Sequence, residues 1–405
     1  MNLRLVSYLL VAAFLQAFQF TCPGQSAAEI REMLEREKYE QIRVIQESDT
    51  FLISLENRVW RWQVTAVGNA LDKISALLPH SALLRLLILE RGIPRLQVTV
   101  SPEVWNRFTS GEISGEETAQ LLTVSEDTEN TWHLVRHEDP KRRSAGNTDL
   151  TAYPQLSFEN TLKSRLYTGQ LNIAPALQVT LWQGGAFTGQ VIFPLYNELG
   201  YEGNFIRPGQ VVLSQDFRVN RLTGRLSAGN FSAGRYGTDA SFTCLLPDEM
   251  WKMKLNAGYT GSSHFYDNRW NHSRLNALTW SLSLSWFIPR YSLELEGGIR
   301  QYVYGDAGIF CSMIRWFGET AFGFYALKTD QTTNGGFRLT VPFPFKKRPG
   351  YHLFRVTFPG HQDMVYNAGT EFHYGQTYRT EPGINLVDGF WNARYIKNFL
   401  LKREN

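Results

Sequence analysis

Glu294 and Glu296 stand two residues apart in the chain, and Arg300 follows them in the same phase. Two carboxylates on one face can act as general acid and general base, as in glycoside hydrolysis. Mixed charge on one face is also what a water-filled protein interior carries for hydration and selectivity. We favour this second, non-catalytic interpretation. The side chains that we expect to face such an interior are Lys252, Lys254, Asn256, Glu294, Glu296 and Arg300.

Other candidate chemistry is weaker. His133 and His137 have the spacing of two metal ligands on one helix face, but their segment resembles a loop and offers no clear third ligand. Ser262, Ser263 and His264 are the nearest approach to a nucleophile with a base. The sequence has no phosphate-binding loop, dinucleotide fingerprint or His-Glu-x-x-His motif. We therefore predict no catalytic residues, no metal and no cofactor.

The candidate residues lie in a stretch of strict period-two alternation, residues 251–300. In its first run one face is apolar (Trp251, Met253, Leu255, Ala257, Tyr259) and the other is polar (Lys252, Lys254, Asn256, Gly258, Thr260). This pattern predicts a β-strand with one wet and one dry side. Two similar runs follow at 278–288 and 291–300.

These runs are about nine to eleven residues long, which is the length that a tilted strand needs to cross the hydrocarbon layer of a membrane. Their apolar faces begin or end on aromatic residues, as the interfacial girdles of transmembrane barrels do. A soluble β-sandwich with one dry face is the alternative, but its strands are usually nearer five or six residues. The pattern favours a membrane barrel.

The whole chain agrees with a mainly β fold. From residue 155 onward about fourteen candidate strands follow one another, which predicts an antiparallel transmembrane β-barrel of about 10 to 14 strands. No apolar run long enough for a spanning helix occurs outside the N-terminus, so a membrane-embedded form has to be a closed barrel. The formal charge of +3 among 405 residues is too small to indicate a nucleic-acid partner.

The sequence divides into four parts. Residues 1–28 have the basic start, apolar core and small-residue exit of a signal peptide, although Cys22 leaves lipid attachment open. Residues 29–122 predict a small periplasmic α/β domain, in which a helix-strand-strand order that occurs twice suggests a duplicated unit. Residues 123–154 read as a linker and residues 155–405 as the barrel. We therefore expect the protein in the cell outer membrane.

Four segments carry a family resemblance: DTFLISLENR at 49–58, LERGIP at 89–94, GNFSAGRYG at 229–237 and VPFPFKKR at 341–348. Together they resemble the YjbH family of exopolysaccharide-associated outer-membrane proteins. The resemblance implies an outer-membrane barrel with a periplasmic α/β portion, made alongside capsule or exopolysaccharide machinery, and it supplies no catalytic residues. This chain is shorter than members that look able to form a second barrel, and it lacks a terminal aromatic residue.

Two functions from different classes follow. In the first, a non-catalytic barrel takes part in export or surface assembly of capsular or exopolysaccharide, and its partners are outer-membrane lipid, the polysaccharide and periplasmic export machinery. In the second, a barrel enzyme modifies lipid or glycan and needs a Ser or Glu with a His at the membrane boundary. We favour the first, because ordinary loop composition explains residues 262–264 equally well.

Overall fold

The computed structural model describes residues 23–160, 167–246, 250–348, 353–369, 373–383 and 387–402. The structure is mainly β, with 55% of the described residues in strands and 18% in helices. Most of the predicted signal peptide lies outside the described residues, and its last part belongs to helix α2 (Pro23–Arg36). Within the described part of the chain, no helix combines the length and apolar character needed to cross a membrane.

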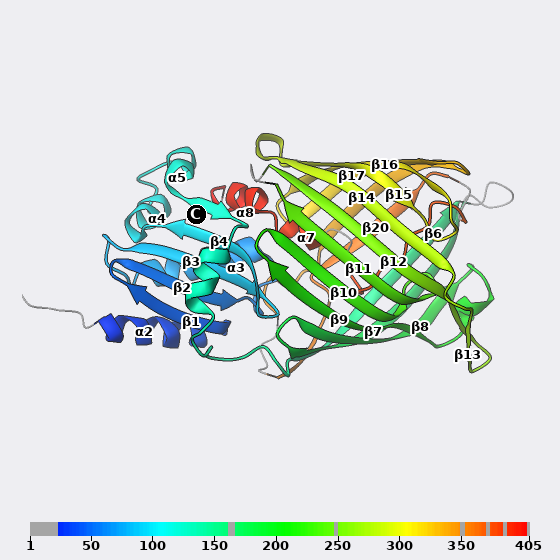
Figure 1. Cartoon of the computed structure of the whole chain (residues 1–405), viewed down its shortest axis with the longest axis horizontal. Coiled ribbons are helices and arrows are strands. Elements are labelled where there is room, and N and C mark those ends of the chain that lie inside the picture. Colours follow the sequence, from blue (N-terminus) through cyan, green and yellow to red (C-terminus); the bar gives the residue numbers. More distant parts are fainter. Residues whose placement is uncertain are drawn as a thin grey trace, which may run out of the picture.

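The N-terminal unit is a five-stranded sheet covered by helices (Figure 1). Its strands are β1 (Glu40–Glu47), β2 (Thr50–Glu56), β3 (Leu83–Glu90), β4 (Ile93–Val100) and β5 (Thr123–Ser125), in spatial order. Helix α3 (Gln63–Ser75) connects β2 to β3, and these two strands are parallel while the other pairs are antiparallel. The helix-strand-strand order predicted from the sequence is therefore present twice, as α2-β1-β2 and α3-β3-β4.

The rest of the N-terminal unit contains three short helices: α4 (Pro102–Thr109), α5 (Gly115–Leu121) and α6 (Glu129–Val135). Ser101 caps α4, with Pro102 in its first turn, and Ser114 forms a capping box with Glu117 at α5. Both caps use the residues that the sequence offers at those positions. The expected linker, 123–154, contains β5, α6 and the start of the next strand.

The second sheet has fifteen strands among the described residues. They are β6 (Thr148–Asn160), β7 (Tyr167–Trp182), β8 (Gly185–Asn197), β9 (Arg207–Val219), β10 (Leu222–Phe231), β11 (Arg235–Leu245), β12 (Trp251–Tyr266), β13 (Arg269–His272), β14 (Ala277–Ile288), β15 (Leu293–Gln301), β16 (Ala307–Phe317), β17 (Thr320–Thr329), β18 (Thr333–Pro342), β19 (Phe354–Thr357) and β20 (His361–Asn367). Consecutive long strands pair antiparallel, and the sheet curls around an interior (Figure 1).

The hydrogen-bonded ladder of the described strands does not close into a ring, which departs from the closed barrel predicted from the sequence. Its two ends are β19, which pairs parallel to β6, and β20, which pairs with β18. Only residues 358–360 separate these short strands, and β20 also lies beside β6. Residues 354–367 therefore contain both end strands of the ladder, which pair with β6 and with β18.

The C-terminal residues form helices α7 (Val387–Phe390) and α8 (Ala393–Leu400), where the sequence analysis places barrel. Asn392 caps α8, and its buried residues Tyr395, Ile396 and Leu400 have helical spacing. The Tyr395 hydroxyl accepts a hydrogen bond from Nε1 of Trp62 (2.9 Å) and donates one to the carbonyl of Gly318 (2.9 Å). Helix α8 thus joins the N-terminal unit to the nearby end of the large sheet, at the turns that follow β14 and β16 (Figure 1).

The large sheet has two distinct ends. We call the end that faces the N-terminal unit the junction end; there Gln183 donates to the carbonyl of Gly92 (3.0 Å) and Arg221 pairs with Asp127 (3.2 Å). We call the opposite end, which carries the turns between β8 and β9, β10 and β11, and β15 and β16, the open end.

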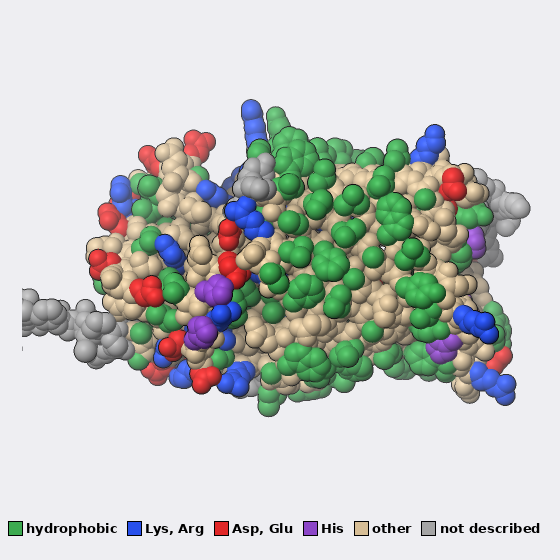
Figure 2. All heavy atoms as spheres, viewed as in Figure 1, with side chains coloured by type: hydrophobic (Ala, Val, Ile, Leu, Met, Phe, Trp, Pro, Cys, Tyr) green, Lys and Arg blue, Asp and Glu red, His purple; other side chains and the backbone are tan. Residues whose placement is uncertain are grey.

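The two faces of the large sheet differ in polarity as the alternation predicts. On β12, Trp251, Leu255 and Tyr259 are 37%, 43% and 47% exposed on the outer face, whereas Lys252 is only 7% exposed. Figure 2 shows apolar side chains over the middle of the sheet, with charged side chains gathered toward its two ends. The outside of the sheet is therefore apolar and the inside is polar.

Candidate functional site in the interior of the sheet

A segment that is not a strand runs through the interior of the curled sheet. We call residues 373–383 the inner segment. At the open end, the ring of His373 stacks on Tyr304 with centroids 3.7 Å apart, and the N–H of Gly375 donates to Asp306 (3.0 Å). Further along, the N–H of Arg379 donates to Oγ of Ser232 (2.7 Å). The segment then continues toward the N-terminal unit, so it crosses the interior from one end to the other.

Tyr378 fixes the middle of the inner segment. Its ring stacks on Phe231 with centroids 5.3 Å apart, and its hydroxyl donates to Oδ2 of Asp239 (2.7 Å). The same hydroxyl lies 3.2 Å from Oγ1 of Thr279. A Cβ at Gly258 would lie 1.7 Å from the Tyr378 hydroxyl, so only glycine leaves room for this contact.

Four charged residues hold the junction end of the inner segment, and we call them the charge cluster: Arg91, Asp216, Arg225 and Glu381. Arg91 pairs with Glu381 (2.9 Å) and with Asp216 (3.1 Å), and Arg225 contacts the same two carboxylates. Burial alone would raise the pKa of Glu381, but Arg225 and Arg91 lower it to about 2. Glu381 is therefore ionised at neutral pH and joins three parts of the chain.

The turn between β3 and β4 positions Arg91. Arg91 and Gly92 both have left-handed backbone (φ 52° and 75°), and their N–H groups donate to the Glu56 carboxylate (2.8 and 2.9 Å). Burial, reinforced by the charges of Glu40 and Glu90, raises the pKa of Glu56 to about 7 although the two N–H groups oppose this shift. Glu56 thus sets the geometry from which Arg91 reaches the interior of the sheet.

Three of the four segments that carry the family resemblance meet at this junction. Glu56 belongs to 49–58 and Arg91 to 89–94. In 341–348, the N–H of Arg348 donates to the carbonyl of Val59 (2.7 Å), and the Lys347 ammonium lies 4.2 Å from the ring centroid of Trp60. These segments therefore connect the N-terminal unit to the large sheet.

The structure places the six expected interior residues on the inner face or at the junction. Lys254 pairs with Glu296 (3.0 Å), which also accepts a hydrogen bond from Ser283 (2.8 Å). Nδ2 of Asn256 donates to Oγ of Ser281 (3.0 Å). The structure thus brings Lys254 to Glu296, so this carboxylate belongs to an ion pair across strands.

The remaining three interact with other parts of the molecule. Arg300 lies over Phe310, 4.1 Å from its ring centroid. Glu294 is buried, and a Cβ at Gly389 of α7 would lie 3.2 Å from its Oε2. Lys252 pairs with Glu126 (2.8 Å), which lies in the expected linker. Lys252 is thus used at the junction rather than in the open interior.

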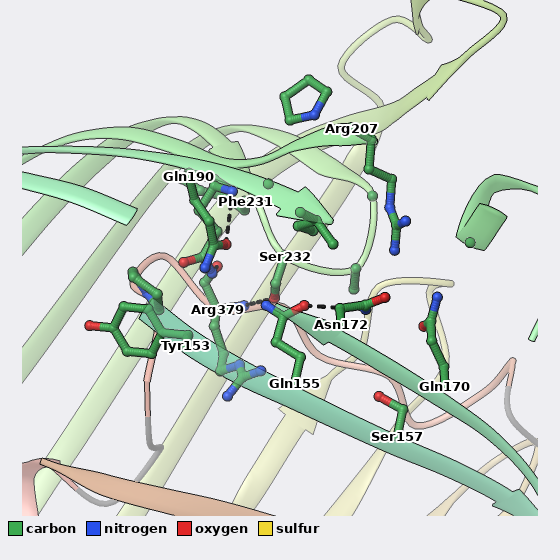
Figure 3. Close-up of a pocket in the computed structure, with 18 of the residues that line it drawn as sticks. Tyr153, Gln155, Ser157, Gln170, Asn172, Gln190, Arg207, Phe231, Ser232 and Arg379 are labelled. Carbon is green, nitrogen blue, oxygen red and sulfur yellow. Dashed lines mark hydrogen bonds between the residues drawn. The ribbon is translucent and has the colours of Figure 1, made fainter. Parts of the chain in front are cut away.

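Two cavities lie in the interior, and Arg379 of the inner segment lines both. The junction basin, of about 650 Å³, extends from Glu90 and Arg95 at the junction end to Tyr302 and Gly375 near the open end, and charged residues of the inner face and of the charge cluster are part of its lining. The open-end chamber, of about 420 Å³, has many amide and hydroxyl side chains in its lining, together with a few charged and apolar ones (Figure 3). The sequence analysis did not single out the chamber residues. Runs of Gln and Asn on the wet faces of β6 to β10 are the signal that could have found them.

The weaker candidates have other partners. Helix α6 ends before His137, and Nε2 of His133 contacts Glu129 instead (2.8 Å). The described residues contain no group of three or more His, Cys, Asp or Glu side chains that could hold a metal ion. At the open end, His264 contacts Glu202 (2.9 Å), and the Ser263 hydroxyl accepts a hydrogen bond from the Trp270 indole (2.6 Å). His264 thus has a carboxylate partner, and Ser263 an indole partner.

Comparison with known proteins finds no matching family model, no matching curated protein and no matching solved structure. Membership of the YjbH family therefore stays a prediction from the four segments.

The pKa of Glu56 predicts a pH dependence of stability. Because its folded-state pKa lies above the ordinary value of 4.5, its stabilising contribution is complete below pH 4.5 and is lost as pH rises to about 7. The loss amounts to about 3 kcal/mol. Thermal unfolding of the full chain between pH 4.5 and 7 should show this decline, and Glu56→Gln should flatten it. The exposed Glu103→Gln is the control, and an equally steep decline in Glu56→Gln would contradict the assignment.

From the ion pairs of the charge cluster we predict that Glu381→Gln makes the inner segment more mobile. Removal of one partner leaves Arg91 and Arg225 to share Asp216, which should destabilise this contact by about 3 kcal/mol. Amide hydrogen exchange at residues 376–381 should become faster. Glu112→Gln, which removes an exposed pair with Arg107, should leave that exchange unchanged. Unchanged exchange in Glu381→Gln would show that the cluster does not hold the segment.

Proposed function

We propose that this chain is an outer-membrane β-barrel protein that takes part in export or surface assembly of capsular or exopolysaccharide and catalyses no reaction. The observation that carries the membrane part is the inverted polarity of the large sheet, apolar outside and polar inside. A water-soluble sheet of this size would instead bury its apolar face in a core.

The outer face supports a lipid environment. Large apolar side chains that are 40% to 60% exposed occur on neighbouring strands, among them Leu255, Leu282, Ile299, Ile309 and Met313. Exposed apolar surface of this extent marks an interaction surface, and here it follows the sheet rather than forming one patch. Trp251 and Trp286 stack at the junction end of this surface, as aromatic residues do at a membrane boundary.

The N-terminal unit and residues 354–367 complete the proposed arrangement. Residues 354–367 form the two end strands of the ladder. We propose that this segment covers the exposed sheet edges, as a lipid environment requires. The N-terminal unit covers the junction end, and we place this end in the periplasm, where the unit binds export machinery. The polar interior and the resemblance to the YjbH family support polysaccharide as the substrate.

Adjacent residues on β12 test the membrane part. Leu255→Arg places a charge in lipid and should cost about 2 to 4 kcal/mol if it lies near the midplane, so less folded barrel should form. Asn256→Arg places the charge in a hydrated interior and should leave folding nearly intact. The amount of folded protein can be measured from its altered migration in unheated gel samples.

A soluble fold with a dry core would also be damaged by Leu255→Arg, so the solvent around each face is the decisive control. Spin labels at Trp251, Leu255 and Tyr259 should report lipid, and labels at Lys254 and Asn256 should report water. Water at both sets would reject the membrane barrel.

The polysaccharide part is tested in cells. Deletion of the gene should lower surface polysaccharide and raise the periplasmic amount, and the full-length chain should restore both. Complementation with Leu255→Arg should fail and with Asn256→Gln should succeed, since only the first disturbs the lipid-facing side. Unchanged polysaccharide in both compartments after deletion would reject this function.

A further inference from the structure

We propose that the open-end chamber binds a neutral sugar unit through amide side chains of the inner face. The inference rests on the proposed function for the class of polymer, and it assigns a site and a mode of recognition. The chamber volume of about 420 Å³ falls within the range of small-ligand sites.

Amide side chains from several strands line one wall of the chamber. They are Gln155, Gln170, Asn172, Gln190, Gln210 and Asn230. Figure 3 shows Gln155 of β6 and Asn172 of β7 beside the inner segment, with a hydrogen bond between them. Amides offer both a donor and an acceptor without charge, so they suit hydroxyl groups, which also do both.

Four of these amides have a buried polar atom without a partner among the described residues: Nε2 of Gln170, Oδ1 of Asn172, Oε1 of Gln210 and Oδ1 of Asn230. Asn172 and Gln210 are each only 4% exposed. Buried polar groups are normally paired, so four such atoms around one cavity indicate a missing partner. Water or a ligand hydroxyl in the chamber would supply that partner.

The orientation of two of the amides is fixed by their neighbours. Nε2 of Gln210 donates to the carbonyl of Arg379 (2.9 Å), and Nδ2 of Asn230 donates to the carbonyl of Gly209 (2.7 Å). A carbonyl oxygen only accepts, so the amide nitrogen has to face it and the amide oxygen is left over. Three of the four unpartnered amide atoms are therefore acceptors, and these attract hydroxyl donors.

The charged groups of the chamber have protein contacts. The Asp363 carboxylate accepts a hydrogen bond from Thr340 (3.0 Å) and lies 3.6 Å from Arg338, and His361 lies 3.5 Å from Glu319. Arg207 donates to the carbonyls of Glu202 (3.2 Å) and Phe205 (3.3 Å), and Arg379 donates to that of Gly383 (2.7 Å). The Glu202 carboxylate contacts His264. We therefore assign sugar recognition to the amide side chains, while the rings of Trp270 and Phe265 add apolar surface to the chamber.

Binding can be measured on the full chain in a detergent without a sugar head group. The probes are tetrasaccharides of glucose, galactose, mannose and N-acetylglucosamine, with tetragalacturonate as the anionic probe. Saturation-transfer NMR should detect binding of at least one neutral tetrasaccharide. Calorimetry should show that the double variant Asn172→Leu, Gln210→Met binds this sugar at least tenfold more weakly. Gln331→Leu, on an open-end turn outside the chamber, should bind as the parent does.

A second variant covers the case in which the buried substitutions prevent folding. Ser157 is an exposed residue of the chamber wall, so Ser157→Trp should fill the chamber without altering the buried amides and should abolish binding. Binding of no neutral probe, binding of tetragalacturonate alone, or full binding by Ser157→Trp would each overturn the proposal.

The experiments can reject the sugar site and the proposed function independently of each other. If no sugar binds while gene deletion still shifts polysaccharide into the periplasm, the chamber assignment is wrong and the function stands. If a neutral sugar binds in the chamber while deletion changes no polysaccharide, the site stands and the cellular function is wrong.

Discussion

The ion pairs of Glu381 with Arg91 and Arg225 connect the N-terminal unit, the large sheet and the inner segment. Burial of charges is costly unless each is paired and hydrogen bonded, and here each carboxylate of the cluster contacts both guanidinium groups. The turn geometry that Glu56 sets is therefore coupled to the path of the inner segment. Residues of that path line both the junction basin and the open-end chamber.

Alternation predicted the strands because a period of two is a local property of the sequence. The faces around Trp251 and Lys252 follow directly from it. The arrangement at the two ends of the ladder does not, since it depends on residues 354–357 pairing with β6, which lies far earlier in the chain. The sequence analysis assigns residues 155–405 to the barrel, yet β20 ends at Asn367 and the helical spacing of Ile396 and Leu400 leads to α8.

The sequence predicts which residues face the interior but not which side chains they contact. Period two indicates that Lys254 and Glu296 face inward, but their contact depends on strand register, which sequence alone leaves open. Lys252 shares that face, yet its partner Glu126 lies in a segment that we interpreted as linker. The inner segment has no periodic pattern at all, so neither Tyr378 nor Glu381 could be assigned a place before the fold was known.

The inner segment occupies the interior of the sheet, and this bears on whether the proposed role is that of an open conduit or of an accessory protein. An open conduit needs a continuous path, but Tyr378 stacks on Phe231 and Glu381 is held by two arginines across that path. Passage of a polymer would require these contacts to break, at a cost of several kcal/mol for the ion pairs alone. An accessory protein that holds polymer at the open end requires no such movement. For a chain with the inner segment in place, we therefore propose an accessory role rather than an open channel.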